Sequence, residues 1–352
     1  MLSRFINGAL LVVMGILFVT GIGMLYGTWL PWISDIHRIS GFAVIALLPW
    51  KAIVVYRSLR RRLVGDAPWL STLLSIPLAA LLIVVVALGL MWMWRLGPYQ
   101  TLAAQTVIAW HWILGLAMVP LFIVHVVVRW PNPRLTDFAS RRGALRLLGL
   151  GAGGVVGWLL GLSLARLRAT EDRPRRAVTG SRGFGQFTGN DYPVVGEQTI
   201  SVDVEQWRLT VDSNVGEPFI LTYDDVLSMS VDQITEAVDC TSGWYSVQEW
   251  QGIPLARLLE EVDGLDAAGV RLVSETEYNH TYPMAEAKTI LLATHVSGEV
   301  LAPGHGYPVR AVVPQRRGWF WVKWLKRIEI LDDPAEVLAG ILYAARQILR
   351  QL

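Results

Sequence analysis

Cysteine is nearly absent from this chain, which has one such residue, Cys240, among 352. A single cysteine excludes internal disulfide bonds, covalent haem attachment through a CxxCH motif, and an iron–sulfur cluster held by four cysteines. Without further context, a lone cysteine is a small buried apolar residue. Net charge is also small, at +2, and it argues against nucleic acid as a partner.

Charged residues are scarce in the first half, and the chain changes character near residue 166. Residues 1–166 contain long apolar stretches with few acids, whereas residues 167–352 have the mixed charges and turn residues of a soluble domain. A bilayer span takes roughly 20 residues, and a soluble core helix rarely stays apolar on every side for so long. Five membrane-spanning helices are therefore predicted, at 5–26, 39–56, 70–94, 104–128 and 143–166.

The arginines beside these stretches predict how the chain is oriented. Two clusters follow the second stretch and separate the fourth from the fifth: Arg57, Arg60, Arg61 and Arg62, then Arg129, Arg134, Arg141, Arg142 and Arg146. The other connections carry little beyond Arg38 and Arg95. The positive-inside rule puts the clusters and the N-terminus in the cytoplasm of a bacterial inner membrane, so the second half is periplasmic. An outer aromatic belt fits Trp29, Trp32, Trp92 and Trp94.

The fifth stretch has a second signature. Residues 140–146 read SRRGALR and precede a glycine-rich apolar run. This pattern resembles a twin-arginine export signal placed inside the chain, which routes folded, cofactor-loaded domains across a membrane. An ordinary basic anchor loop is the alternative. No clear small-residue cleavage site follows, so we expect the helix to be retained as an anchor.

Histidines recur inside the apolar stretches, where ionisable groups are costly and indicate function. His111 and His125 are 14 residues apart, which on a helix gives about 21 Å of rise and roughly 40° of rotation. The two imidazoles thus share one helix face at two depths. In the second stretch, His37 is followed 14 residues later by Lys51. Because both helices run inward, His37 lies level with His111, and Lys51 with His125.

This spacing resembles that of four-helix dihaem cytochromes of the cytochrome b561 and formate dehydrogenase type. The resemblance implies a haem b held by His37 and His111 near the outer face, and a second haem deeper in the bundle. Structural histidines are the alternative for the outer pair. The departure at Lys51 leaves two interpretations of the inner level. A neutral Lys51 can ligate iron with His125, or its ammonium can extend to the inner interface.

The second half predicts an α+β domain. Residues 207–211 alternate as a strand does, and amphipathic helices are expected near 222–230 and 254–262. Residues 167–187 read as a linker. The segment 334–352 places apolar residues on one helical face, which either docks on the protein or lies on the membrane surface.

Four motifs in the second half occur in register over roughly residues 188–331. They are VDCTSGW at 238–244, WQGIPL at 250–255, GEVL at 298–301 with HGYPVR at 305–310, and a glycine at 318 with KWL at 323–325. Their order and spacing resemble the sulfite oxidase family, which includes the catalytic subunit of periplasmic methionine sulfoxide reductase. That resemblance implies a molybdenum–molybdopterin cofactor, with Cys240 as the one protein thiolate on the metal and as the catalytic residue.

The family also implies which residues hold the pterin, whose terminal phosphate attracts cations and backbone donors. The matching positions are Arg310, Lys323 and Gly318, and less closely His305, Thr276, Asn190 and Tyr192. One position departs from the family pattern, because Phe320 stands where a lysine often occurs. The aromatic run 319–321 is a candidate surface for meeting the membrane domain.

Together these patterns predict four regions. They are a four-helix transmembrane cytochrome b domain at 1–135, a fifth helix and linker at 136–187, a molybdopterin domain at 188–333, and a C-terminal amphipathic helix at 334–352. The predicted function is oxygen-atom transfer on an extracytoplasmic substrate, an S-oxide or a sulfite-like anion, coupled through haem b to membrane quinone. Two alternatives remain: a quinone-linked cytochrome that acts on small oxidants, and a sensor or electron-transfer module with a degenerate molybdenum domain.

Overall fold

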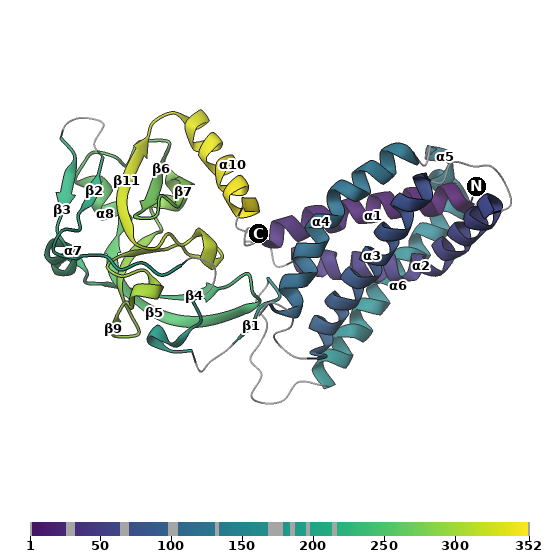
Figure 1. Cartoon of the computed structure of the whole chain (residues 1–352), viewed down its shortest axis with the longest axis horizontal. Coiled ribbons are helices and arrows are strands. Elements are labelled where there is room, and N and C mark those ends of the chain that lie inside the picture. Colours follow the sequence, from purple (N-terminus) through teal and green to yellow (C-terminus); the bar gives the residue numbers. More distant parts are fainter. Residues whose placement is uncertain are drawn as a thin grey trace. The chain divides into compact units, whose positions relative to one another are not determined.

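The computed structural model divides into two compact units, Met1–Gly180 and Ser181–Leu352 (Figure 1). The described residues are 2–25, 32–63, 70–97, 105–130, 134–167, 179–183, 187–194, 198–212 and 217–350. Trp29, Leu352 and most of the predicted linker lie outside them. The boundaries predicted from the sequence after residues 135, 187 and 333 stay predictions.

The first unit is helical. Five of its described helices are long and apolar enough to cross a membrane: α1 (Leu2–Leu25), α2 (Trp32–Leu63), α3 (Leu70–Trp94), α4 (Val107–Val128) and α6 (Arg141–Leu167). All five predicted spans are confirmed as helices. The second differs most from expectation, because α2 begins seven residues before 39 and runs seven past 56. Helical hydrogen bonding continues through its charged ends, which hydropathy alone does not register. A short helix, α5 (Leu135–Ala139), precedes α6.

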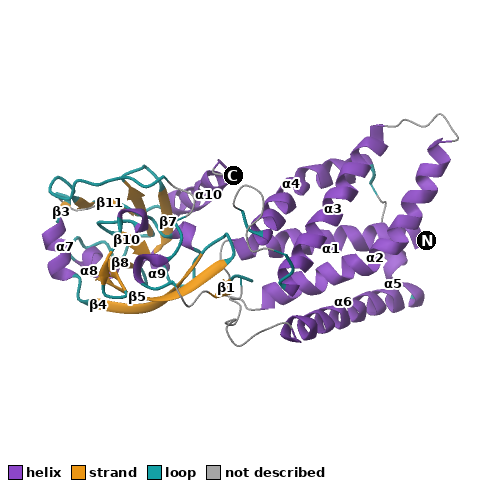
Figure 2. Ribbon diagram, turned by 60° about the horizontal axis from the view of Figure 1, so that its bottom comes forward, coloured by secondary structure: helices purple, strands orange, loops and turns teal. Residues whose placement is uncertain are grey.

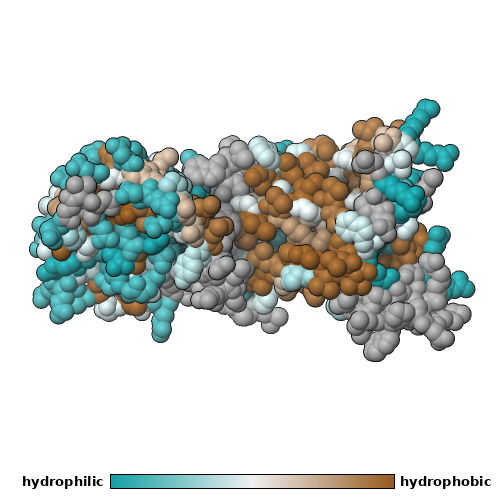
Figure 3. All heavy atoms as spheres, turned by 90° about the horizontal axis from the view of Figure 1, so that it is seen from above, coloured by the Kyte–Doolittle hydropathy of each residue, from teal (hydrophilic) through white to brown (hydrophobic). Residues whose placement is uncertain are grey.

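Apolar side chains cover the outside of these helices as well as their interior. Val19, Val127 and Leu148 are each 70% exposed or more, and Figure 3 shows hydrophobic residues gathered over the surface of the helices. So large an exposed apolar surface is compatible with a membrane protein. Inside, Phe5, Met14 and other apolar residues pack into one core, shared by α1, α2, α3 and α4.

Glycines let α6 approach the neighbouring helices closely. A Cβ added at Gly154 would lie 2.9 Å from the carbonyl oxygen of Ile39, and one at Gly157 would lie 2.9 Å from Phe42. At Gly161 the nearest atom, 2.8 Å away, belongs to Met93 of α3. Small residues are how membrane helices obtain close backbone packing. The fifth helix is thus a packed member of the bundle.

The second unit is an α+β domain, as predicted, and it contains two sheets (Figure 2). In its described part, one sheet runs β1–β5–β8–β10, with β4 added beside β5 and β9 beside β8; the other runs β3–β2–β11–β6–β7. The strands of the first sheet are β1 (Arg182–Gly183), β4 (Asp232–Asp239), β5 (Trp244–Pro254), β8 (Leu291–Val296), β9 (Glu299–Val300) and β10 (Arg310–Val312). Those of the second are β2 (Leu209–Val211), β3 (Phe219–Leu221), β6 (Gly269–Ser274), β7 (Asn279–Pro283) and β11 (Leu325–Leu331).

Short helices connect these strands, and two of them confirm the predicted helices near 222–230 and 254–262. The helices are α7 (Tyr223–Met229), α8 (Leu255–Glu260) and α9 (Met284–Ala287), with 3₁₀ turns η2 (Gly189–Asp191), η3 (Pro303–His305) and η4 (Gly318–Phe320). Thr222 caps α7 by accepting from the Asp225 amide, while the Asp225 carboxylate accepts from the Thr222 amide. This reciprocal capping box fixes where the helix begins.

The C-terminal helix α10 (Pro334–Arg350) packs on the second sheet, on β7 and β6. Val337 is buried, and a Cβ added at Gly269 would lie 2.9 Å from it. Gly340 meets Thr281 so closely that any larger residue would force the helix away. Leu338 and Leu342 stay exposed. Two interpretations of this segment were open: docking on the protein or lying on the membrane surface. Docking on the protein explains the helix face that packs against β7 and β6.

Candidate molybdopterin site

Cys240 lies in a tight turn that joins β4 to β5. Its amide donates to the Trp244 carbonyl oxygen at 2.8 Å, and the Gly243 amide donates back to the Cys240 carbonyl oxygen at 2.9 Å. Gly243 has a φ of +92°, a conformation that side chains rarely adopt, so glycine suits this position. The Ser242 hydroxyl donates to the Cys240 sulfur at 3.1 Å. These hydrogen bonds therefore fix the conformation of the turn and the orientation of the Cys240 side chain.

A buried arginine supports the turn from behind. One Nη of Arg317 donates to the Cys240 carbonyl oxygen at 2.6 Å and to the Asp239 carboxylate at 3.2 Å. The Ser181 hydroxyl donates to the same carboxylate oxygen at 2.6 Å. Burial raises the pKa of the Cys240 thiol, while the Ser242 hydrogen bond and the Arg317 charge act in the opposite direction. Only a strong electrophile such as a metal would hold this sulfur as thiolate at neutral pH.

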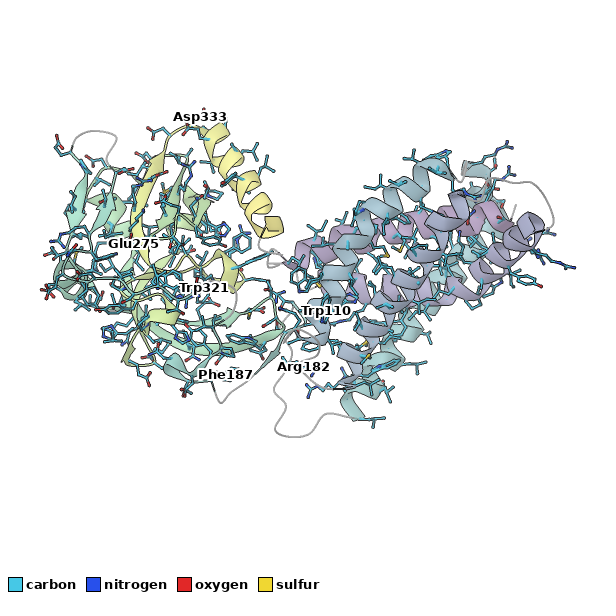
Figure 4. The ribbon with its side chains drawn as sticks, in the orientation of Figure 1. Trp110, Arg182, Phe187, Glu275, Trp321 and Asp333 are labelled. Carbon is cyan, nitrogen blue, oxygen red and sulfur yellow. The ribbon has the colours of Figure 1, made fainter. Side chains whose placement is uncertain are left out.

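A second cluster of polar side chains surrounds Arg310, the first residue of β10. Arg310 is 2% exposed, and one Nη donates to the Tyr192 hydroxyl at 2.6 Å and to the His305 carbonyl oxygen at 3.0 Å. Its guanidinium lies 5.3 Å from the ring centre of Trp250 and 5.4 Å from that of Trp321. Figure 4 labels Trp321 within the second unit. Among the described residues, no carboxylate pairs with Arg310, so its charge is buried without a counter-ion.

His305 lies against the same cluster. Its Nε2 is 2.8 Å from the Tyr192 carbonyl oxygen, and its ring centre is 4.1 Å from that of Tyr192. Nδ1 of His305 is buried and, in the described part of the chain, has no hydrogen-bond partner. Burial lowers the pKa of His305, assisted by the charges of Arg310 and Lys323. Burial also raises the pKa of Tyr192, and Arg310 opposes that effect. The cluster thus combines a buried cation with a neutral imidazole.

Gly306 brings the cationic residues together. Its φ is +106°, and an added Cβ would lie 3.0 Å from the Cβ of Arg310 and 3.1 Å from that of Lys323. The Lys323 ammonium lies 5.1 Å from the ring centre of Trp324. Three of the predicted cofactor residues, His305, Arg310 and Lys323, are therefore neighbours at one glycine.

The remaining predicted residues border this region in different ways. Asn190 ties η2 to the turn after β9, since its side chain donates to Glu299 and Val300 and accepts from the Ala302 amide. Thr276 follows Glu275, whose amide donates to the Trp324 carbonyl oxygen at 2.8 Å. A Cβ added at Gly318 would lie 3.5 Å from the Asp239 carbonyl oxygen, which places η4 beside the cysteine turn.

Phe320 packs inward. It is 7% exposed, with its ring centre 4.9 Å from that of His280 and 5.0 Å from the Arg316 guanidinium. Trp321 is also buried. The aromatic run 319–321 is therefore chiefly part of the domain interior, and the expectation that it forms an outer surface is wrong for these two residues.

Two residues of the site were given no role by sequence reasoning: Ser181 and Asp239. Asp239 lies inside the motif at 238–244, directly before Cys240, so adjacency was the available signal. Ser181 lies in the predicted linker and had none. Only the pairing of β1 with β5 brings it to the turn.

In the first unit, the outer histidines face one another. The ring centres of His37 and His111 are 6.1 Å apart, at an interplanar angle of 80°. His111 Nδ1 is 2.8 Å from the Val85 carbonyl oxygen, and His37 Nδ1 is 2.9 Å from the Thr20 hydroxyl. Since that hydroxyl donates to Ile16, it accepts from His37. Both δ-nitrogens thus carry the proton, and both ε-nitrogens keep a lone pair.

At the inner level the two candidate ligands have separate partners. The Lys51 Nζ donates to the Asn7 side-chain oxygen at 2.9 Å. His125 Nδ1 lies 3.4 Å from the Ser75 hydroxyl. Neither contact occupies the Nε2 of His125.

Comparison with known proteins accounts for the second unit. Residues 196–338 match the family described as oxidoreductase molybdopterin binding domain. The chain is 31% identical over 154 residues to the "Uncharacterized oxidoreductase YuiH" of Bacillus subtilis, covering 42% of this chain and 78% of that protein. Among solved structures, it resembles the sulfane dehydrogenase SoxCD from Paracoccus pantotrophus at 25% identity and a TM-score of 0.36. That match covers 38% of this chain and 40% of the other.

The second unit therefore carries a domain type that implies a molybdenum cofactor, and the apolar helices of the first unit are consistent with a membrane cytochrome b561-like domain. The chain belongs to the molybdopterin-binding oxidoreductases and is an enzyme of the sulfite oxidase type.

Proposed function

We propose that this protein is a membrane-bound enzyme in which Cys240 binds molybdenum and oxygen-atom transfer outside the cytoplasm is coupled through haem b to quinone. Cys240 carries the proposal: the only thiol in the chain is held in a fixed turn inside the segment that matches the family. The substrate class is an S-oxide, which would be reduced, or a sulfite-like anion, which would be oxidised.

The residues around Arg310 fit the phosphate of a molybdopterin. In the described part of the chain, this buried guanidinium has no carboxylate partner, which favours an anion as its ligand. When bound, the cofactor supplies two-electron, oxygen-atom-transfer chemistry. The protein's part is to hold the thiolate of Cys240, to anchor the phosphate with Arg310 and Lys323, and to orient Arg310 through the Tyr192 hydroxyl.

The outer histidines fit one haem. An imidazole–metal bond is about 2 Å long and the ring centre lies about 1.1 Å further, so rings on opposite sides of one metal have centres about 6 Å apart. The separation of 6.1 Å between His37 and His111 agrees. Gly21 and Gly89 lie against these rings, where an added Cβ would be 3.4 Å and 3.0 Å from an imidazole carbon. Proton donation to Thr20 and Val85 orients both rings, as is usual for metal-bound histidine.

Whether a second haem binds between Lys51 and His125 is a question of stoichiometry. The hydrogen bond to Asn7 is compatible with a neutral amine that also offers a lone pair to iron, and equally with an ammonium. We expect about two haems per chain if Lys51 is a ligand and about one if it is not. Lys51→Met should then alter only the inner haem spectrum. Unchanged spectra with two haems retained would exclude lysine ligation.

The arginine distribution supports a cytoplasmic N-terminus and a periplasmic second unit. Protease added to intact cells without an outer wall should cut beyond residue 166. Cleavage only after lysis would reverse the orientation. Membrane lipid and quinone are the proposed partners of the first unit.

Substitution of Cys240 tests the central proposal. Cys240→Ser removes the soft thiolate but keeps the size of the side chain, so turnover that depends on molybdenum should be lost while haem spectra stay unchanged. Full turnover with normal molybdenum content would contradict the assignment. Metal analysis of the purified protein separates this function from the alternatives, since a quinone-linked cytochrome or a sensor with a degenerate domain would contain no molybdenum.

A further inference from the structure

The chain just before the matched domain takes part in the cysteine turn. Residues 181–183, the strap, precede residue 196, where the family match begins. Arg182 and Gly183 form β1, which pairs in parallel with Trp244 and Tyr245, directly after the turn. The Arg182 amide donates to the Gly243 carbonyl oxygen at 2.8 Å.

Ser181 connects the strap to a buried ion pair. Its side chain donates to Asp239 at 2.6 Å and lies 3.2 Å from the Arg317 guanidinium. Ser181 is 1% exposed, and the side chains of Arg317 and Asp239 are 6% and 12% exposed. Arg317 also donates a hydrogen bond to the Cys240 carbonyl oxygen. The three side chains form one hydrogen-bonded group beside the Cys240 backbone, at the start of η4.

Arg317 and Asp239 carry opposite charges, and their pairing matters because both side chains are largely buried. Opposite charges a few ångströms apart cancel at the sulfur, whereas either charge alone would act on it through a weakly screening interior. A lone carboxylate would make an adjacent metal centre harder to reduce. A lone guanidinium would make it easier to reduce.

We propose that Ser181, Asp239 and Arg317 are positioning residues that fix the Cys240 backbone and set the reduction potential of the metal centre bound there. This rests on the proposed role of Cys240 as the metal ligand. The strap is thereby a functional part of the site, although it lies outside the segment that matches the family.

The test is a double-substitution cycle in the full-length protein, read by potentiometric titration of the Mo(V) electron paramagnetic resonance signal. Arg317→Gln should lower the potential, since it leaves Asp239 unbalanced, and Asp239→Asn should raise it. The double variant should return toward the wild-type value. Ser181→Ala should shift the potential in the same direction as Arg317→Gln, but less, because the hydrogen bond that it loses to Asp239, at 2.6 Å, is shorter than the one that it loses from Arg317, at 3.2 Å.

A matched control is Arg271→Gln. Arg271 also forms a close ion pair, 2.7 Å from Glu329, but on the five-stranded sheet. In the Arg271→Gln protein, the reduction potential of the metal centre should stay at the wild-type value. The proposal would be overturned if Arg317→Gln and Asp239→Asn shifted the reduction potential in the same direction, or if neither shifted it.

Two further variants keep the test decisive. If the Arg317→Gln protein fails to bind the metal, Ser181→Ala must still lower the reduction potential. Arg317→Lys keeps the positive charge, so it must change the potential less than Ser181→Ala does. A Cys240→Ser protein with an unchanged Mo(V) signal would instead refute the ligand assignment, and so separates failure of the proposed function from failure of this inference.

Discussion

Replacing Arg310 by methionine separates a cofactor-holding residue from a structural one. Arg310 has no carboxylate partner among the described residues, so Arg310→Met leaves no lone buried charge behind. It loses hydrogen bonds to Tyr192 and His305, but it also removes the desolvation penalty of a buried cation, and both effects are several kcal/mol. We expect the cofactor-free fold to change in stability by about 2 kcal/mol or less.

Cofactor binding should respond much more strongly. Two charge-assisted hydrogen bonds from Arg310 to a phosphate are worth about 1.5–3 kcal/mol each, which together correspond to roughly two to four orders of magnitude in affinity. Purified Arg310→Met protein should therefore contain little molybdenum or pterin.

Arg317→Met is the matched comparison, because it removes the cation that pairs with the buried Asp239 carboxylate. Breaking a buried pair in this way costs about 3–5 kcal/mol. For a unit of this size that is roughly 10 °C in melting temperature, against a few degrees for Arg310→Met. The assays are metal and pterin content of each variant, and thermal unfolding of protein produced without molybdate. Equal losses of cofactor-free stability, or normal cofactor content in Arg310→Met, would refute the reasoning.

Three further outcomes are expected. His111→Leu should remove one haem per chain while molybdenum content stays the same, as measured by pyridine haemochrome and metal analysis. His280 is buried and its pKa is lowered to about 4, so the unfolded state binds more protons below pH 6.5; stability should fall by about 3 kcal/mol as pH drops from 6.5 toward 4, and His280→Gln should flatten this slope in acid-dependent melting. Gly157→Val would crowd Phe42 and should destabilise the helical bundle by about 1–3 kcal/mol in detergent melts, whereas Gly153→Val, with nothing within 4 Å, should not.

The sequence alone determined the five long apolar helices, the α+β class of the second half and the family. Hydropathy is a local property, so all five spans were found, although the charged ends of α2 were not. The family motifs were legible for the same reason: Cys240, His305 and Arg310 each stand in a short contiguous run. Helical periodicity placed His37 level with His111, because rise and rotation per residue are fixed by backbone geometry.

Tertiary structure decided what depends on pairing between distant segments. Ser181 reaches Asp239 only because β1 pairs with β5, and strand register between segments some 60 residues apart is not encoded in either one. Likewise, the absence of a carboxylate beside Arg310 in the described part of the chain, and the presence of one beside Arg317, could not be read from the sequence, where Arg310 ends one family motif and Arg317 precedes the glycine of another. Burial fixes the consequence, since a charge removed from water must be balanced by a neighbour, and the fold alone determines which neighbour that is.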